Sequence, residues 1–292
     1  MQNVELIMKY VIKNFTFFVK GKIMREIKCI DIIEKVKQLC IEAACDLPDD
    51  VLNALINKKN EEDYSLAKKT LDVLIDNADL ARENMMPICQ DTGMAFVYVT
   101  MGQEVHIDGD LKEAINEGIR QGYQEGYLRK SVVDDPLFDR INTKDNTPAI
   151  IYFDIVTGDE FKIVVAPKGF GSENMSQIKM LKPSDGVQGV KDFVLKVVND
   201  AGPNACPPMV IGVGIGGSFD KVTLLSKQAM MREIGSHHPD SRYADLETEL
   251  LEMINATGIG PAGYGGKTTA LSLNIETHPT HIAGMPVAVS IC

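Results

Sequence analysis

The stretch PPMVIGVGIGGSFDKVTLLSKQAMM, residues 207–231, decides the fold class. Its first part, residues 207–217, is an apolar run that ends in glycines, which is typical of a buried strand leading into a turn. Its second part, residues 220–231, repeats apolar side chains at helical spacing. A buried strand followed directly by a helix indicates a domain in which helices pack on a sheet.

Elements of the same two kinds extend along the chain on both sides of this stretch. Ile and Leu recur at steps of three and four over residues 27–84, where LPDD at residues 47–50 gives a helix stop and a helix start. Further helices are predicted over residues 110–128 and 186–202, and strands over residues 93–102, 147–156 and 160–169, the last two joined as a hairpin by TGD. We therefore predict a mixed α/β (α+β) fold, with a helical N-terminal portion followed by a mixed sheet with flanking helices.

The first 23 residues differ in pattern from the rest of the chain. Four lysines interrupt their apolar patches, so none of these patches reaches the length of about 20 residues that a membrane span needs. An ordinary amphipathic pattern begins only at Met24. We interpret residues 1–23 as a disordered extension or a segment upstream of the natural start, and residues 24–292 as one domain.

Composition and charge exclude several classes of protein. The 292 residues are 45% hydrophobic, which is enough for a sizeable core. A net charge of −11 argues against a nucleic-acid partner, because phosphate binding depends on clustered Lys and Arg. Six unevenly spaced cysteines do not form a secreted disulfide framework. We expect a cytoplasmic protein with reduced or metal-bound thiols and neither a nucleic-acid nor a membrane partner.

Two glycine-rich stretches invite a nucleotide-binding interpretation. Gly212, Gly214 and Gly217 fit G-x-G-x-x-G between a strand and a helix, but the acidic residue expected about 20 positions later at the end of a second strand is missing. The stretch GIGPAGYGGKTT resembles a phosphate-binding loop, but Pro261 occupies the place of its opening glycine. A dinucleotide-dependent oxidoreductase is therefore a disfavoured alternative, which tight NAD binding would revive.

Three isolated cysteines lie at the ends of predicted strands. Cys89 heads the polar run CQDTG, Cys206 precedes a strand, and Cys292 follows one. Zinc would require a fourth protein ligand, whereas an iron–sulfur cluster could accept three thiolates and leave one iron open. The structural alternatives are inert buried thiols and, for Asp91, an ordinary turn. The residues alone leave these readings open.

Five motifs together carry a resemblance to a known family. They are PICQDTGM (87–94), YLRKSVVDDPL (127–137), GFGSENMSQIKML (169–181), CPPMVIGVGIGGSFDKVTLLSKQAMMREIG (206–235) and the segment from INATGIG to AVSIC (254–292). In this order they resemble the α subunit, or N-terminal domain, of the class I, iron–sulfur-dependent fumarate hydratase and L-tartrate dehydratase family.

The resemblance implies a [4Fe–4S] cluster held by Cys89, Cys206 and Cys292, with an open iron that binds a dicarboxylate substrate. It implies Asp91 and His281 as catalytic residues, and Gln90, Arg129, Gly171, Ser172 and Asn174 as substrate contacts. An arginine suits this role because its planar fork meets a carboxylate with two parallel hydrogen bonds. An aspartate beside a cluster ligand could exchange a proton with the departing oxygen.

The implied activity is that of a hydro-lyase, first of all fumarate hydratase, the enzyme of the tricarboxylic acid cycle that interconverts fumarate and L-malate. The alternative is L(+)-tartrate dehydratase, which forms oxaloacetate. A non-catalytic iron–sulfur scaffold or sensor is disfavoured, since a scaffold would not need Asp91, Arg129 and His281 together. The resemblance also implies a separate β subunit that completes the active site, in a dimer of αβ pairs.

Overall fold

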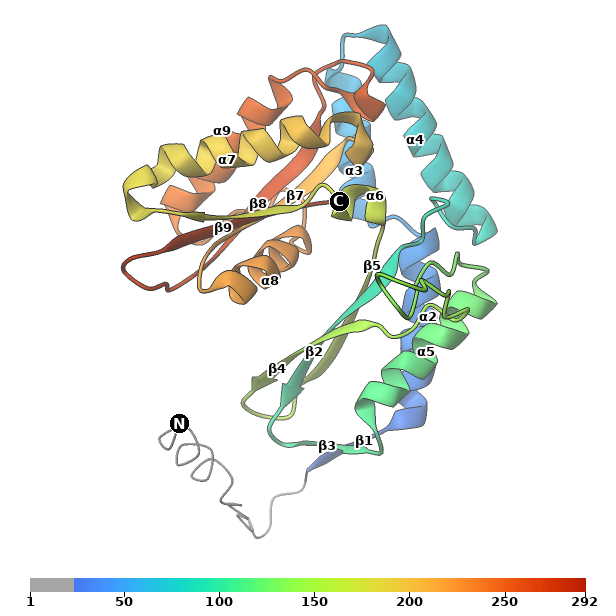
Figure 1. Cartoon of the computed structure of the whole chain (residues 1–292). Helices are drawn as coiled ribbons and strands as arrows, with labels where there is room; N and C mark the ends of the chain where they lie inside the picture. The colour runs from blue at the N-terminus through green and yellow to red at the C-terminus, as the bar shows by residue number, and fades with distance from the viewer. Residues whose placement is uncertain (1–23) are drawn as a thin grey trace.

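The computed structural model describes residues 24–292, so the extension predicted for residues 1–23 lies outside the described part. Within it, an N-terminal lobe and a C-terminal lobe each contain a sheet, and a pair of helices lies beside both (Figure 1). None of the helices in residues 24–292 is long and apolar enough to cross a membrane. The predicted mixed α/β architecture is confirmed.

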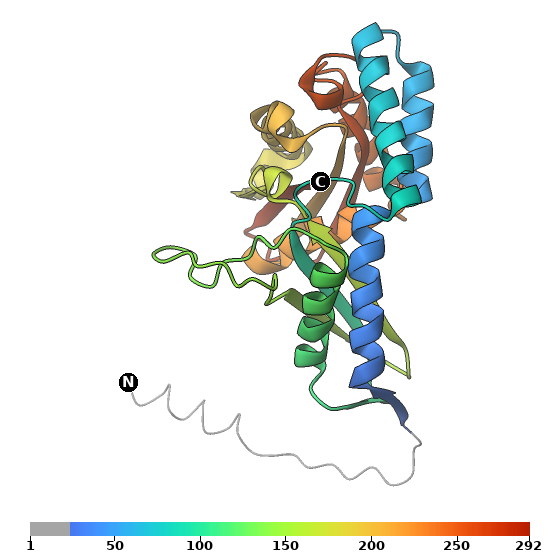
Figure 2. The same ribbon diagram turned by 90° about the vertical axis from the view of Figure 1, so that its right-hand side faces the viewer.

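The N-terminal lobe packs two helices against a three-stranded sheet. Its elements are β1 (Arg25–Lys28), α2 (Cys29–Cys45), β2 (Met94–Gly102), β3 (Val105–Asp108), α5 (Leu111–Glu125), β4 (Ile150–Val156) and β5 (Phe161–Lys168). Apolar side chains of α2, α5 and β2, among them Val36, Ile115 and Val97, are fully buried and form one core. The segment 126–149 between α5 and β4 projects from this lobe (Figure 2).

The predicted hairpin of residues 147–169 is wrong. The sheet order is β4-β2-β5, so β2 pairs in parallel with β4 and antiparallel with β5, and it separates the two strands. The reason is burial: Ala95 and Val97 of β2 are fully buried, whereas Phe153 and Ile155 of β4 are 50% and 58% exposed. The most apolar strand therefore takes the centre of the sheet, where it is covered on both edges.

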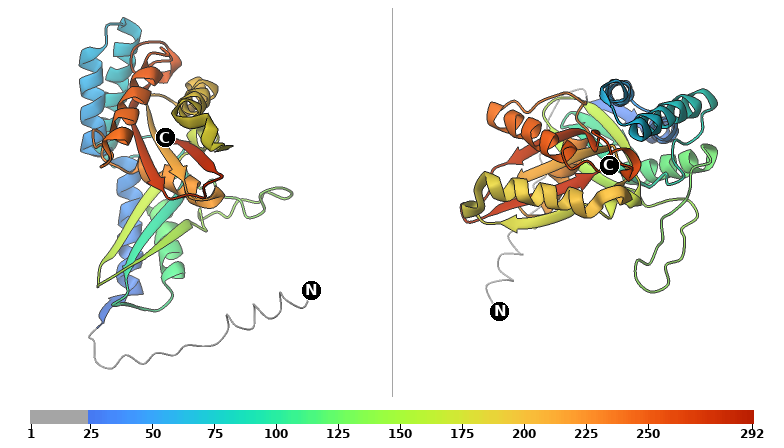
Figure 3. Two further views of the ribbon diagram at one scale, coloured as in Figure 1. Left: turned by 90° about the vertical axis from the view of Figure 1, so that its left-hand side faces the viewer. Right: turned by 90° about the horizontal axis from the view of Figure 1, so that it is seen from above.

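The C-terminal lobe is a four-stranded mixed sheet between helices. Its elements are β6 (Gln177–Leu181), α7 (Gly186–Ala201), β7 (Met209–Gly216), α8 (Phe219–Met230), α9 (Ser241–Asn255), β8 (Ala270–His278) and β9 (Met285–Ile291), with short 3-10 turns at Pro183–Asp185, Gly202–Ala205 and Pro261–Gly263. The strand order is β6-β9-β7-β8. Helix α8 covers one face, and α7 and α9 cover the other (Figure 1). The C-terminal residue lies near the middle of the molecule, where the lobes meet (Figure 3).

The strand and helix predicted from residues 207–231 are confirmed as β7 and α8. The glycines between them have a packing role. A Cβ on Gly212 would lie 1.9 Å from the carbonyl oxygen of Ser226, and one on Gly214 would lie 2.2 Å from that of Val222. These two glycines thus allow α8 to lie directly on β7, which accounts for the G-x-G pattern without a nucleotide.

A helical pair connects the two lobes. Helices α3 (Asp49–Glu61) and α4 (Ser65–Asn84) pack side by side (Figure 2), and the predicted break at residues 47–50 is confirmed. Leu55 and Leu71 from this pair form a small core with Leu271 of the C-terminal lobe. The pair therefore fixes the loop that follows α4, which carries Cys89.

Candidate functional site

The loop of residues 85–93, between α4 and β2, is held by its backbone and leaves the Cys89 side chain exposed. The Ile88 amide donates to the carbonyl oxygen of Ala44 at 2.9 Å, and the Asn77 side chain donates to the carbonyl oxygen of Ile88 at 3.0 Å. Cys89 follows at once and is exposed and free. Its position is therefore set by α2 and α4.

A pocket of about 410 Å³ lies at this loop. It is lined by Pro87, Ile88, Cys89, Gln90, Thr92, Tyr127 and Arg129. The Thr92 hydroxyl donates to the carbonyl oxygen of Arg129 at 3.1 Å, which ties the segment after α5 to the loop. The structure thus brings together three of the residues predicted from sequence, namely Cys89, Gln90 and Arg129.

Asp91 joins this loop to the segment after β5. Its Oδ1 accepts a hydrogen bond from the Gly93 amide at 3.0 Å, and its Oδ2 accepts one from the Phe170 amide at 2.8 Å. Gly93 has a φ of +68°, and a Cβ there would lie 2.3 Å from the Lys168 backbone. The Asp91 carboxylate therefore does make a turn, and it also holds two segments that are distant in sequence in close contact.

The predicted substrate contacts Gly171, Ser172 and Asn174 lie in and just after the short helix α6 (Phe170–Glu173). The Ser172 hydroxyl accepts a hydrogen bond from Lys168 Nζ at 2.6 Å. These residues do not line the Cys89 pocket, and their link to it runs through the contact between Phe170 and Asp91.

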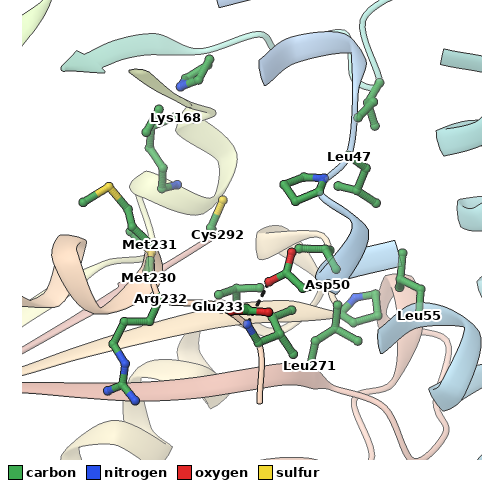
Figure 4. A pocket seen from close by; sticks show the side chains of 18 of the residues that line it. Leu47, Asp50, Leu55, Lys168, Met230, Met231, Arg232, Glu233, Leu271 and Cys292 are labelled. Atoms are coloured by element: carbon green, nitrogen blue, oxygen red, sulfur yellow. Dashed lines mark hydrogen bonds between the residues drawn. The ribbon is translucent and has the colours of Figure 1, made fainter. Parts of the chain in front are cut away.

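Cys206 and Cys292 line a second, larger cavity of about 870 Å³, which lies between the lobes. Cys292 exchanges two backbone hydrogen bonds with Val210, at 2.8 and 2.9 Å, so the end of β9 lies beside the start of β7. Figure 4 shows Cys292 and Lys168 on the side of the cavity opposite Leu47 and Leu55. Ile88 lines both this cavity and the Cys89 pocket, so the three cysteines face two adjoining spaces.

His281 lies elsewhere in the chain. It is exposed in the turn between β8 and β9, and its Nδ1 accepts a hydrogen bond from the Ala283 amide at 3.2 Å. The seven residues of β9 span about 20 Å and separate this turn from Cys292. The structure therefore does not bring His281 to the cysteines of its own chain.

Sequence reasoning missed a buried lysine at the cavity. Lys168 is only 5% exposed and lies within salt-bridge distance of Glu173. Burial and the positive charge of Lys227 lower the pKa of Lys168, while the negative charges of Cys292, Glu173 and Asp91 act in the opposite direction. Lys168 closes the apolar run VVAPKG, where a lysine is expected to be a solvated strand end, so the sequence pattern gave no signal of its burial.

Comparison with known proteins identifies the family. Residues 33–292 match the family model described as fumarate hydratase (fumerase). This chain belongs to that hydro-lyase family. It is 43% identical over 265 residues to a Methanocaldococcus jannaschii protein named "Putative L(+)-tartrate dehydratase subunit alpha", covering 89% of this chain and 93% of the relative. It is 34% identical over 248 residues to the L(+)-tartrate dehydratase subunit alpha of Escherichia coli K12, covering 84% of this chain and 81% of the relative.

The thiols of this fumarate hydratase family member fit the iron–sulfur cluster that the family implies. Cys89, Cys206 and Cys292 are free and exposed, whereas burial raises the pKa of Cys40 to about 12 and makes it a core thiol. Among residues 24–292, no three His, Cys, Asp or Glu side chains converge closely enough to hold a single metal ion. In a cluster each thiolate binds a different iron, so the three exposed thiols that line the two adjoining spaces are the groups that could hold it.

Proposed function

We propose that this chain is the α subunit of an iron–sulfur L(+)-tartrate dehydratase that works with a separate β subunit. The observation that carries the proposal is the 43% identity along 93% of a relative named for that activity. The names of the relatives thus favour tartrate over fumarate, which the sequence analysis placed first. The words "subunit alpha" in these names support a β-subunit partner, and we propose a dimer of αβ pairs.

The pocket at Cys89 supports a dicarboxylate as the ligand. Arg129 and Gln90 both line it. A guanidinium can bind a carboxylate through two parallel charge-assisted hydrogen bonds, and an amide can donate a third. We therefore assign substrate binding to Arg129 and Gln90, with Gly171, Ser172 and Asn174 as further contacts. These groups also argue against a non-catalytic scaffold, which would need the thiols alone.

The chemistry proposed for this chain is ligand holding and proton transfer. Cys89, Cys206 and Cys292 would hold the [4Fe–4S] cluster, which when bound supplies a Lewis-acidic iron for the substrate carboxylate and hydroxyl. Asp91, two residues from Cys89, would exchange a proton with the departing hydroxyl oxygen, because the backbone amides of Gly93 and Phe170 hold its carboxylate in place.

His281 enters the proposal differently. Because it lies at the opposite end of β9 from Cys292, we propose its proton-transfer role only for a site that this chain shares with another chain of the assembly.

We also propose that the complex works in the cytoplasm, since free thiols persist in a reducing compartment.

Fumarate hydratase remains the second candidate, because the matching family model carries that description. Tartrate and malate differ by one hydroxyl. The test is an anaerobic assay of this chain with its β subunit on L(+)-tartrate, D(−)-tartrate, L-malate and fumarate, under identical conditions. We expect the highest kcat/KM for L(+)-tartrate. A higher kcat/KM for fumarate and L-malate would replace the proposal with the second candidate, and no turnover of any of the four would reject both.

A further inference from the structure

Three charged side chains from three different elements meet beside the cavity that contains Cys206 and Cys292. Lys227 of α8 donates to Glu173 Oε1 of α6 at 2.6 Å, and Lys168 Nζ of β5 lies 3.8 Å from Glu173 Oε2. The side chains of Lys168, Lys227 and Glu173 are 6%, 11% and 20% exposed. Three buried or nearly buried charges require a reason, because each loses favourable hydration.

Lys168 organises the segment around α6. Its Nζ donates to the Ser172 hydroxyl at 2.6 Å and to the Gly169 carbonyl oxygen at 3.1 Å. The same segment offers the Phe170 amide to Asp91 at 2.8 Å. The Lys168 ammonium thus fixes Gly169, and the next residue, Phe170, donates the hydrogen bond that holds the Asp91 carboxylate.

Within this cluster two ammonium groups face one carboxylate, and Glu173 Oε2 accepts no hydrogen bond from a described residue. The Asp91 carboxylate is a further negative charge near Lys168. Lys227 also lies over the ring of Phe96, 4.4 Å from its centroid. Lys168 and Lys227 both line the cavity with Cys292. Figure 4 shows the end of the Lys168 side chain directed toward the side of the cavity where Cys292 lies.

We propose that Lys168 is a positioning residue of the hydro-lyase: its ammonium holds residues 169–174 and Asp91 in place, and the positive charge of that ammonium acts on the group that Cys292 binds. This inference rests on the proposed function, since it concerns the same cluster. It adds a role for Lys168, Glu173 and Lys227. A buried charge next to an iron–sulfur cluster shifts its reduction potential, because that potential depends on nearby charge.

The test compares four variants of the full complex with its β subunit. Lys168→Met removes one positive charge, and we expect the reduction potential of the cluster to fall. Glu173→Gln removes one negative charge, and we expect that potential to rise. Lys168→Arg keeps the charge, and we expect a potential near the wild-type value. Lys162→Met changes an exposed lysine of the same strand, and we expect no change.

Potentials are measured by anaerobic redox titration followed by electron paramagnetic resonance, with iron content, melting temperature, kcat and KM determined for each variant. We expect Lys168→Met to lower kcat/KM by about tenfold to a hundredfold, the scale of misplaced catalytic groups. Opposite shifts in Lys168→Met and Glu173→Gln support the proposal, since a merely structural defect would not change sign with charge. Shifts of the same sign, or none, overturn it.

If Lys168→Met does not retain the cluster, the reduction potential of the Glu173→Gln variant tests the proposal alone. A raised potential supports it, and an unchanged or lowered potential overturns it. A wild-type complex without iron would instead reject the proposed function itself. The two failures are therefore distinguishable in one series of preparations.

Discussion

Replacing Asp91 with asparagine separates the two roles that the structure gives this residue. Its two carboxylate oxygens each accept one backbone hydrogen bond, from Gly93 at 3.0 Å and from Phe170 at 2.8 Å. Asparagine retains one acceptor oxygen and turns an amide N–H₂ toward the other donor. The variant therefore loses one hydrogen bond and also loses the group that could exchange a proton.

The two losses have different magnitudes. A hydrogen bond to a charged group contributes about 1.5–3 kcal/mol, and the partly exposed position of Asp91 reduces this to about 1–2 kcal/mol. We expect the melting temperature to fall by about 2–8 °C, which leaves the protein folded at assay temperature. Loss of a general acid–base group lowers kcat by about 10²-fold or more, far beyond what the lost stability explains.

The assay is anaerobic steady-state turnover of the αβ complex, with iron content and thermal unfolding measured on the same samples. Asp110→Asn is the matched control, because Asp110 caps α5 by accepting a hydrogen bond from the Glu113 amide at 3.0 Å, and asparagine caps a helix equally well. An Asp91→Asn complex with full iron content and turnover within about threefold of wild type would refute the catalytic assignment. The Asp91 loop would then be a turn only.

Three further predictions concern binding, packing and acid stability. Arg129→Lys replaces the planar fork with a point charge, and we expect KM for the dicarboxylate to rise by about tenfold in steady-state assays. Gly212→Ala places a Cβ 1.9 Å from a backbone oxygen of α8, and we expect a loss of at least about 1–3 kcal/mol in urea unfolding. Burial raises the pKa of Asp145, but hydrogen bonds from Thr147 and Arg120 outweigh it and hold the pKa at about 2. Since this pKa lies below the ordinary 3.8, Asp145 stabilises the fold above about pH 4, and its contribution of about 1–2 kcal/mol disappears as the pH falls to about 2. The stability difference between wild type and Asp145→Asn should therefore shrink over that range in thermal melts.

Each of these predictions has its own control or contradicting result. Lys130→Met changes the charge next to Arg129 without touching the pocket residues, so its KM should remain at the wild-type value. Gly284→Ala meets no atom closer than 3.9 Å and should be neutral, whereas a neutral Gly212→Ala would disprove the packing role of that glycine. A stability difference that stays constant between pH 4 and pH 2 would rule out the linkage proposed for Asp145.

Local patterns were sufficient to predict much of the fold. The apolar run and the helical spacing of residues 207–231 predicted β7 and α8, because each depends on neighbours along the chain. The order β4-β2-β5 could not be predicted in this way. It depends on which strand is most deeply buried in the assembled lobe, and the TGD turn alone predicts a simple hairpin.

The candidate site shows the same limit. The motif around Cys89 predicted that Gln90 and Asp91 lie in a loop just before a strand, and the structure places them between α4 and β2. The burial of Lys168 was not predictable, since it arises only when α6 and α8 pack over the end of β5. His281 and Cys292 lie at opposite ends of β9, which separates them in space. The motif THPTHIAGMPVAVSIC places both residues close together in the sequence and gave no sign of this separation.

The most direct test of the account is the iron and acid-labile sulfide content of the anaerobically reconstituted αβ complex, measured for wild type and for serine variants of the three exposed cysteines. We expect about four irons and four sulfides per wild-type chain, the content of one [4Fe–4S] cluster. Cys89→Ser, Cys206→Ser and Cys292→Ser should each lose most of this iron, while Cys40→Ser, which changes a core thiol, should retain it. An iron-free wild-type complex, or full iron content in all three variants, would contradict the central claim.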